Sequence, residues 1–187
     1  MAIDKDQILG QIINFIVGLI SKEKTAEVSV TIPLGQDAPP SPPPIDWISP
    51  ASKITEHFTV GDMTMLHEWN RLANDMDGFT DGMKARIIVL CQKMEEVRAL
   101  LGCPMNVHCG FRSQEYNKQV VKAIPNDVHA MGLAIDFDCN PHMTIDQVKA
   151  KLEPELDKLG IRMERGTTTW VHLDLHAVGP SGRYFTA

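Results

Sequence analysis

The sequence predicts an α+β domain, with helices in the first part of the chain and short strands, interrupted by one helix, in the second. Up to about residue 101, apolar residues recur with the spacing that is typical of amphipathic helices. Beyond that point, apolar and polar residues alternate over short stretches, which is typical of half-buried strands. Helices and strands that are segregated in this way favour an α+β fold over an alternating α/β fold.

The first zone of the 187-residue chain, residues 1–22, predicts an amphipathic, strongly apolar helix. Its apolar stripe is too wide for a helix surrounded by water. We therefore expect an anchor or oligomerisation element that is buried against a copy of itself, another protein, a membrane surface or the downstream domain. The stripe consists of Ile8, Leu9, Ile12, Ile13, Phe15, Ile16, Leu19 and Ile20.

A proline-rich linker, residues 23–48, forms the second zone. Its residues 38–44 read Ala-Pro-Pro-Ser-Pro-Pro-Pro, which favours an extended, semi-rigid polyproline II spacer. Such composition is typical of a domain boundary. The third zone, residues 49–187, is long enough to fold as a domain with its own hydrophobic core.

Four helices are expected within this domain. Two precede the strands, over residues 62–74 and 82–101, and Gly102 ends the second. Ser113 is a good N-cap for a short third helix. The fourth spans residues 144–152 and begins with a capping box, Thr at the first position and Gln three residues later.

Four strands are expected between and after these helices, over residues 105–109, 133–138, 162–164 and 169–175. In the second strand the apolar residues point to one side, which leaves Asp136 on the polar side. The domain should therefore contain a small antiparallel sheet with flanking helices.

The composition excludes several classes of protein. The net charge is −6 without a Lys/Arg cluster, which argues against a nucleic-acid partner. No apolar run approaches the roughly 20 residues of a transmembrane segment, and the acidic start is wrong for a signal peptide. No CxxC pair occurs, so we expect reduced and mostly buried thiols. The cysteines are Cys91, Cys103, Cys109 and Cys139.

Two stretches of the domain carry the residue types of a metal site. His129 lies in a polar loop that leads into the strand of Asp136, where small neighbours leave room. On the last expected strand, alternate positions place His172, Asp174 and His176 on one side. His129, Asp136 and His172 would supply two nitrogens and one oxygen. Three such ligands and a position left for water are typical of catalytic zinc.

These residues resemble a known family, the zinc D-alanyl-D-alanine peptidases of bacterial cell walls. The resemblance rests on three motifs in order: Gly-Phe-Arg-Ser at 110–113 with Tyr-Asn at 116–117, His129-x-x-Gly-x-Ala-x-Asp136, and Trp-Val-His at 170–172. The segment 54–64 is similar to the opening of phage-type members. The family shares its fold with hedgehog signalling domains, so the resemblance implies a hedgehog/DD-peptidase-like domain.

The resemblance also implies the roles of several residues. His129, Asp136 and His172 would hold Zn²⁺. Arg112 would bind the substrate's carboxylate or polarise its carbonyl, because a guanidinium offers a planar fork of donors. Ser113 and Asn117 would shape the same pocket.

The general base is left open by the sequence. Better-known members carry an acid or a histidine three residues before the last metal ligand, where this chain has Thr169. Glu164 and Asp174 are the alternatives, with Glu164 favoured. Asp174 could instead orient a ligand imidazole, and His176 is the least favoured candidate. His108, just before the Gly-Phe-Arg motif, could narrow the pocket, whereas Asp138 is expected to be solvated.

The expected function is a zinc-dependent peptidase that hydrolyses peptidoglycan stem peptides or crosslinks next to D-amino acids. It would be encoded by a bacteriophage, as an endolysin or a virion-associated enzyme, and act from the virion or the host cytoplasm. Residues 1–48 would bind a protein partner or a second copy. The alternative, favoured by Thr169, is a structural or binding component of a phage tail or baseplate with little or no catalysis.

Overall fold

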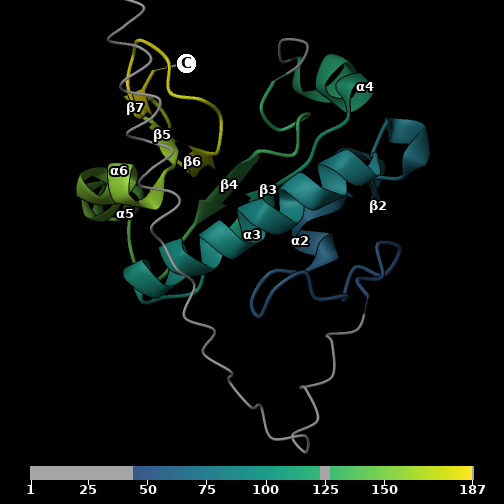
Figure 1. Ribbon diagram of the computed structural model, residues 1–187, viewed down its shortest axis with the longest axis horizontal. Coiled ribbons are helices and arrows are strands. Elements are labelled where there is room, and N and C mark those ends of the chain that lie inside the picture. Colours follow the sequence, from purple (N-terminus) through teal and green to yellow (C-terminus); the bar gives the residue numbers. More distant parts are fainter. Residues whose placement is uncertain (1–43, 123–126, 187) are drawn as a thin grey trace, which may run out of the picture. The chain divides into compact units, whose positions relative to one another are not determined.

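The computed structural model describes residues 44–122 and 127–186 (Figure 1). The helix expected over residues 1–22 and most of the proline-rich linker lie outside the described residues. The end of that linker packs onto the domain, because the Trp47 ring meets Phe79 edge-on with centroids 5.5 Å apart. The segment that folds with the domain therefore includes Trp47.

A five-stranded sheet forms the centre of the domain. Its order is β3-β4-β6-β5-β7, and neighbouring strands are antiparallel except for the parallel pair β5 and β7. The expected small antiparallel sheet is thus present, with an additional edge strand that the sequence did not indicate. The strands are β3 (Asn106–Cys109), β4 (Ala134–Asp138), β5 (Arg162–Glu164), β6 (Val171–Asp174) and β7 (Tyr184–Phe185).

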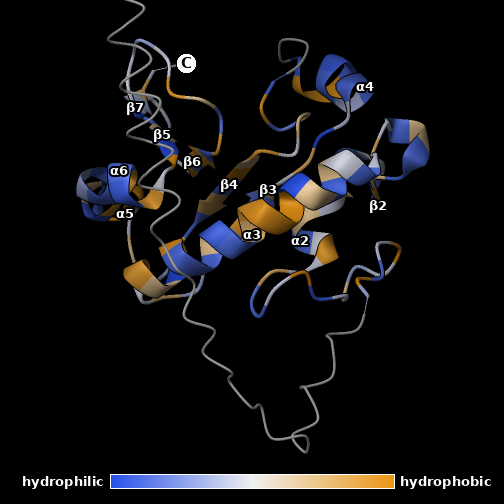
Figure 2. Ribbon diagram, viewed as in Figure 1, coloured by the Kyte–Doolittle hydropathy of each residue, from blue (hydrophilic) through white to orange (hydrophobic). Residues whose placement is uncertain are grey.

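The long helix α3 (Asp81–Leu101) lies alongside β3 and β4 in Figure 1. Thr80 caps its first turn, and Gly102 ends it in the left-handed conformation with φ 73°, as the sequence predicts. Hydrophobic residues gather on β4 and on the middle turns of α3 (Figure 2). The buried side chains of α3 that join the core are Ile87, Leu90, Cys91, Met94, Val97 and Leu101.

The prediction of one helix over residues 62–74 is wrong. Helix α2 (Val60–Thr64) is a single turn with a capping box at Thr59. A short hairpin follows it, with β1 (Met65–Leu66) paired to β2 (Arg71–Leu72) around the 3₁₀ turn η1 (His67–Trp69). The turn closes at Asn70, whose φ of 48° is left-handed, a conformation that asparagine tolerates but a helix does not.

The remaining helices are short. The capping box over residues 144–147 is confirmed, as is the N-cap role of Ser113. A π-helical segment directly continues the helix that Ser113 begins. The elements are α4 (Gln114–Tyr116), η3 (Asn117–Val121), α5 (Ile145–Leu152), η4 (Glu153–Glu155) and α6 (Leu156–Leu159).

All four cysteines are free thiols in the structure, as the sequence predicts. Cys91 and Cys139 are buried, and burial raises the pKa of the Cys139 thiol to about 12. Among the helices of the described residues, none has the length and apolarity to cross a membrane.

Gly110 joins the strand β3 to the turn that carries Arg112, and it lies against the backbone of α2. A Cβ at this position would stand 2.5 Å from the Met63 carbonyl oxygen and 2.8 Å from its Cα. The next residue, Phe111, donates its backbone N–H to the same oxygen at 2.7 Å. This close approach fixes the start of the Gly-Phe-Arg segment relative to the core.

We predict that Gly110→Ala lowers the free energy of unfolding by roughly 1–3 kcal/mol, because the obstructing atoms are backbone and cannot rotate away. Chemical denaturation monitored by circular dichroism measures the change. The matched control is Gly179→Ala, whose Cβ would meet nothing within 4 Å. The control should shift stability by no more than about 0.5 kcal/mol, and equal losses in both variants would contradict the explanation.

Candidate metal centre

Neighbouring strands of the sheet bring two of the expected ligands together. In the register of β4 and β6, Asp136 lies directly opposite His172, and in that of β3 and β4, Cys109 lies opposite Asp136. Side chains of directly opposed residues point to the same side of a sheet. The sheet therefore builds a row of metal-binding residue types across three strands.

His129 reaches this row from the turn that precedes β4. Gly132 supports the turn in the left-handed conformation, with φ 71°, and donates its N–H to the His129 carbonyl. The His129 ring is buried and its Nδ1 donates to the Gly110 carbonyl at 2.7 Å. That bond fixes Nδ1 as a protonated nitrogen, so Nε2, which faces Asp136 and His172, is the nitrogen that can bind a metal ion once its own proton is lost.

The three expected ligands converge on one point. His129 Nε2 lies 3.3 Å from His172 Nδ1 and 3.4 Å from Asp136 Oδ2, and His172 Nδ1 lies 2.7 Å from Asp136 Oδ1. A tetrahedral zinc ion with ligands at about 2.1 Å separates them by roughly 3.4 Å. Two of the three separations already have this value, and the donor set suits zinc, so the residues fit the ion that the sequence predicts.

A second grouping of ligand atoms overlaps the first. Cys109, His129 and Asp136 offer atoms that all lie within 4.8 Å of one another. In this grouping Cys109 Sγ lies 3.7 Å from His129 Nδ1. Because Nδ1 is engaged by the Gly110 carbonyl, a metal shared through that nitrogen would break an existing bond. The set that uses Nε2 keeps the bond, and we favour it.

The electrostatics of the site arise from burial and from these contacts. Burial opposes charge on His129, but hydrogen bonds to Asp136 and Cys109 outweigh it and raise its pKa to about 10. Burial likewise opposes charge on Asp136, and bonds from both histidines hold its pKa well below the usual range. The metal-free site thus keeps protons that a metal ion displaces when it binds.

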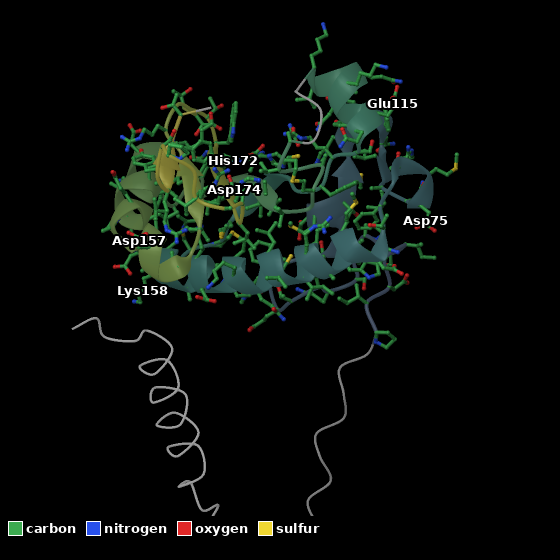
Figure 3. All side chains as sticks on the ribbon, turned by 45° about the horizontal axis from the view of Figure 1, so that its top comes forward. Asp75, Glu115, Asp157, Lys158, His172 and Asp174 are labelled. Atoms are coloured by element: carbon green, nitrogen blue, oxygen red, sulfur yellow. The ribbon has the colours of Figure 1, made fainter. Side chains whose placement is uncertain are left out.

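Asp174 lies behind His172 on the same strand, and Figure 3 shows the two residues close together. Its carboxylate is fully buried and receives two bonds from Arg162, at 2.8 Å and 2.9 Å. The other ring nitrogen of His172, Nε2, lies 3.4 Å from Asp174 Oδ2. A carboxylate already held by a guanidinium is suited to orienting the imidazole, which favours the second of the two roles left open for Asp174. His176 lies beyond β6 with an exposed side chain and donates its backbone N–H to Asp174.

Glu164 ends the strand on the far side of β6. The register of β5 and β6 pairs Arg162 with Asp174 and Met163 with Leu173; continued by one residue, the same register would set Glu164 opposite His172. Alternation along the strand puts the Glu164 side chain on the same side of the sheet as His172. Thr169 lies in the exposed segment between these strands and lines the adjacent pocket.

A buried lysine holds this segment in place. Lys149 on α5 donates its ammonium group to the carbonyl of Arg165 at 2.9 Å and to that of Thr167 at 2.5 Å. Desolvation by burial lowers the pKa of Lys149. The lysine therefore ties the connection between β5 and β6, which presents Thr169 and Trp170, to the core.

A cavity of about 450 Å³ adjoins the metal-binding residues. Its wall is partly apolar, since it includes Trp170 and Val121, each of which is 40% exposed. Arg112 contributes a cation that is paired with Asp127 at 2.9 Å. The lining residues are His108, Arg112, Val121, Asp136, Thr169 and Trp170.

Ser113 and Asn117, expected to shape this pocket, are buried and are not among its lining residues. Ser113 is buried and accepts the N–H of Tyr116 as an N-cap. Asn117 is buried at the start of the π-helical segment, and its amide finds no hydrogen-bond partner in the described residues. Arg112 Nε is likewise buried and finds no hydrogen-bond partner among the described residues. Of the three residues, Arg112 is the one that lines the cavity.

Sequence reasoning missed two supporting residues and misplaced a third. Arg162 and Lys149 depend on contacts between distant segments, and no local pattern indicates them, whereas His108 lines the cavity as the sequence suggested. The expectation that Asp138 is solvated is wrong: it is 7% exposed and lies 2.6 Å from His108 Nε2. The alternation of acids along β4 was the available signal, because it places Asp138 on the same side as Asp136.

We predict that Asp174→Asn weakens zinc binding about 10- to 100-fold, because the amide holds the His172 imidazole less well than a carboxylate does. Competition with a chromophoric chelator measures the affinity. His176→Gln is the control, since its side chain is exposed and bonds only to the neighbouring Ala177 carbonyl among described groups. Unchanged affinity in Asp174→Asn would show that the carboxylate does not orient the ligand.

A comparison with protein families finds the Peptidase M15 family over residues 57–174. The matched span contains His129, Asp136 and His172 and ends at Asp174, the last residue of β6. Neither the search of curated proteins nor the search of solved structures returned a match. The family match covers more than half of the chain, and it agrees with the zinc D-alanyl-D-alanine carboxypeptidase-like resemblance of the sequence. The chain belongs to the Peptidase M15 family and is a metallopeptidase of that family.

Proposed function

We propose that the protein is a zinc-dependent hydrolase of peptidoglycan peptides that cuts bonds next to D-amino acids. The observation that carries this proposal is the convergence of His129 Nε2, Asp136 and His172 Nδ1 beside a cavity lined by Arg112. Three ligands that leave one coordination position free suit catalysis rather than a structural role.

The chemistry divides between the metal and the protein. Zinc, when bound, acts as a Lewis acid toward the scissile carbonyl and makes water a better nucleophile at neutral pH. We assign the general base to Glu164, whose place opposite His172 in the extended register supports this role. Its carboxylate would take the proton of the attacking water and pass it to the leaving amine. Asp174 would keep the His172 ring in the orientation that binding requires.

Arg112 is the proposed anchor of the substrate. Asp127 holds one end of the guanidinium at 2.9 Å, which leaves donors for a carboxylate or a carbonyl in the cavity. Trp170 and Val121 would pack against small apolar side chains such as that of alanine. The choice of D-amino acids rests on the family resemblance in the sequence.

The biological setting is also part of the proposal. The phage-like opening of the domain and the apolar stripe of residues 1–22 favour a phage-encoded enzyme, either virion-associated or a lysin, that residues 1–48 tether to a partner or to a second copy. The competing function is a tail or baseplate component that keeps the fold without catalysis. Thr169, where related enzymes carry an acid or a histidine, favours that second candidate.

We predict that the full chain binds one zinc ion and cleaves peptidoglycan fragments, and that His172→Ala abolishes both properties. Removing one of three ligands leaves too few to hold the ion. Metal analysis and mass spectrometry of the incubated fragments measure the two properties, and the product masses identify the bond. His67→Ala, an exposed histidine of the η1 turn, is the control and should change neither.

Two results would contradict this reading in different ways. Zinc that binds without cleavage of any fragment would favour the structural component. A chain that binds no zinc would remove the basis of the proposed mechanism.

We predict further that Glu164→Gln lowers kcat by about 10²- to 10⁴-fold, the usual loss of a general base, while zinc content and KM stay near wild type. Steady-state kinetics with the best fragment measure the effect. Asp174→Asn is the informative comparison. It should lower the zinc content of the protein more than it lowers the kcat of the zinc-loaded enzyme. A Glu164→Gln variant with undiminished kcat would assign the base to another group.

A further inference from the structure

His108 stands at the cavity because of an irregularity in the sheet. In the pairing of β3 with β4, the register shifts between Val107 and Cys109, so that one extra residue of β3 is accommodated. A β-bulge of this kind re-aims a side chain and is frequent beside active sites. Here the extra residue is His108, which lines the cavity together with Asp136 and Arg112.

The His108 ring is held from behind by a carboxylate that is itself fixed. Asp138 Oδ2 lies 2.6 Å from His108 Nε2. Asp138 Oδ1 accepts the Asn106 side-chain amide at 2.8 Å and the Asn140 backbone N–H at 2.8 Å. Asn106 also donates to the Asn140 carbonyl at 2.9 Å. A simple surface contact would not require so many hydrogen bonds. The network orders the His108 ring, although the His108 side chain is 49% exposed.

The second ring nitrogen of His108 remains available. Within residues 44–122 and 127–186, no group forms a hydrogen bond with His108 Nδ1, whereas His108 Nε2 contacts Asp138. A protonated imidazole donates from both ring nitrogens and can bind a carboxylate at each. A carboxylate that enters the cavity would therefore bind His108 Nδ1, while Asp138 holds Nε2.

Arg112 repeats the same arrangement on the cavity wall. Asp127 lies 2.9 Å from Arg112 Nη2 and is tied down by the Ala130 backbone N–H at 2.9 Å. The cavity is thus lined by two nitrogen-donor side chains, each backed by its own anchored carboxylate. Asp136 is the one carboxylate among the lining residues, and a bound metal ion would offset its charge.

We propose that His108 is a further substrate-binding residue that, together with Arg112, holds a carboxylate of the peptide substrate. The inference rests on the proposed function and narrows its substrate class to peptides with a free carboxylate near the scissile bond. The partly apolar wall of Trp170 and Val121 strengthens this recognition, because charge-assisted bonds weaken less where water is scarce. His108 is assigned a role in binding and specificity; Glu164 remains the assigned base.

The test compares a D-alanine-terminated stem peptide with its C-terminal carboxamide, using the zinc-loaded full chain. Wild-type enzyme should show a lower KM for the acid. His108→Gln should raise the KM of the acid roughly tenfold or more, leave its kcat within about twofold, and leave the KM of the amide unchanged. Asp138→Asn should act in the same direction, because it releases the ring. His67→Gln is the matched control on an exposed histidine.

A binding measurement separates this inference from the proposed function. Calorimetric titration of N-acetyl-D-alanine and its amide requires no turnover, and His108→Gln should lose most of the preference for the acid. Such a loss supports the inference even if no peptide is cleaved. An equal change of KM for acid and amide, or an unchanged preference in the binding assay, would overturn it.

Discussion

The antiparallel register of β4 and β6 is the constraint on which the centre depends. It sets Asp136 opposite His172, and the next pair in the same register sets Ala134, a small residue, opposite Asp174. A slip by one residue would turn the ligands to the other side of the sheet and the apolar residues Ile135 and Leu173 toward solvent. The buried core therefore enforces the register, and the register places the ligands. One register of β4 and β6 therefore both buries the apolar side chains and brings the candidate metal ligands together.

Anchored carboxylates recur around the centre. Asp174 backs His172, Asp127 backs Arg112 and Asp138 backs His108, and each is held by other donors of its own. These contacts lie at partly or fully buried positions, where a lower effective dielectric strengthens an ion pair and makes its disruption costly. The side chains that face the cavity are consequently ordered before a substrate arrives, which reduces the entropy that binding must overcome.

The sequence predicted those parts of the molecule that local patterns determine. The C-terminal cap of α3, the N-terminal cap of α5, the strand of residues 162–164 and the common side of His172 and Asp174 all follow from short-range periodicity and capping. The hairpin at residues 65–72 could not be predicted in this way, because its apolar residues also fit a helix. Only the left-handed turn at Asn70 distinguishes the hairpin from a helix. The strand β7, the pairing of Arg162 with Asp174 and the bulge at His108 arise from contacts between segments far apart in the chain. No single-sequence pattern specifies such pairings, so the candidate ligands could be proposed from the sequence, whereas the residues that support them could not.

The order of the strands offers a reason why this chain can have threonine, and not an acid, at position 169. The metal-binding pair of β4 and β6 is flanked by β5 on one side and β3 on the other. Glu164 lies on the strand of the first flank and His108 on that of the second, so each neighbouring strand adds a titratable side chain to those of the candidate ligands. In the proposed roles, Glu164 would accept a proton on one flank and His108 would bind a carboxylate on the other, so the two side chains would not compete for the same space. With this division of roles the chain would not need a further acid at position 169, whose threonine lines the cavity.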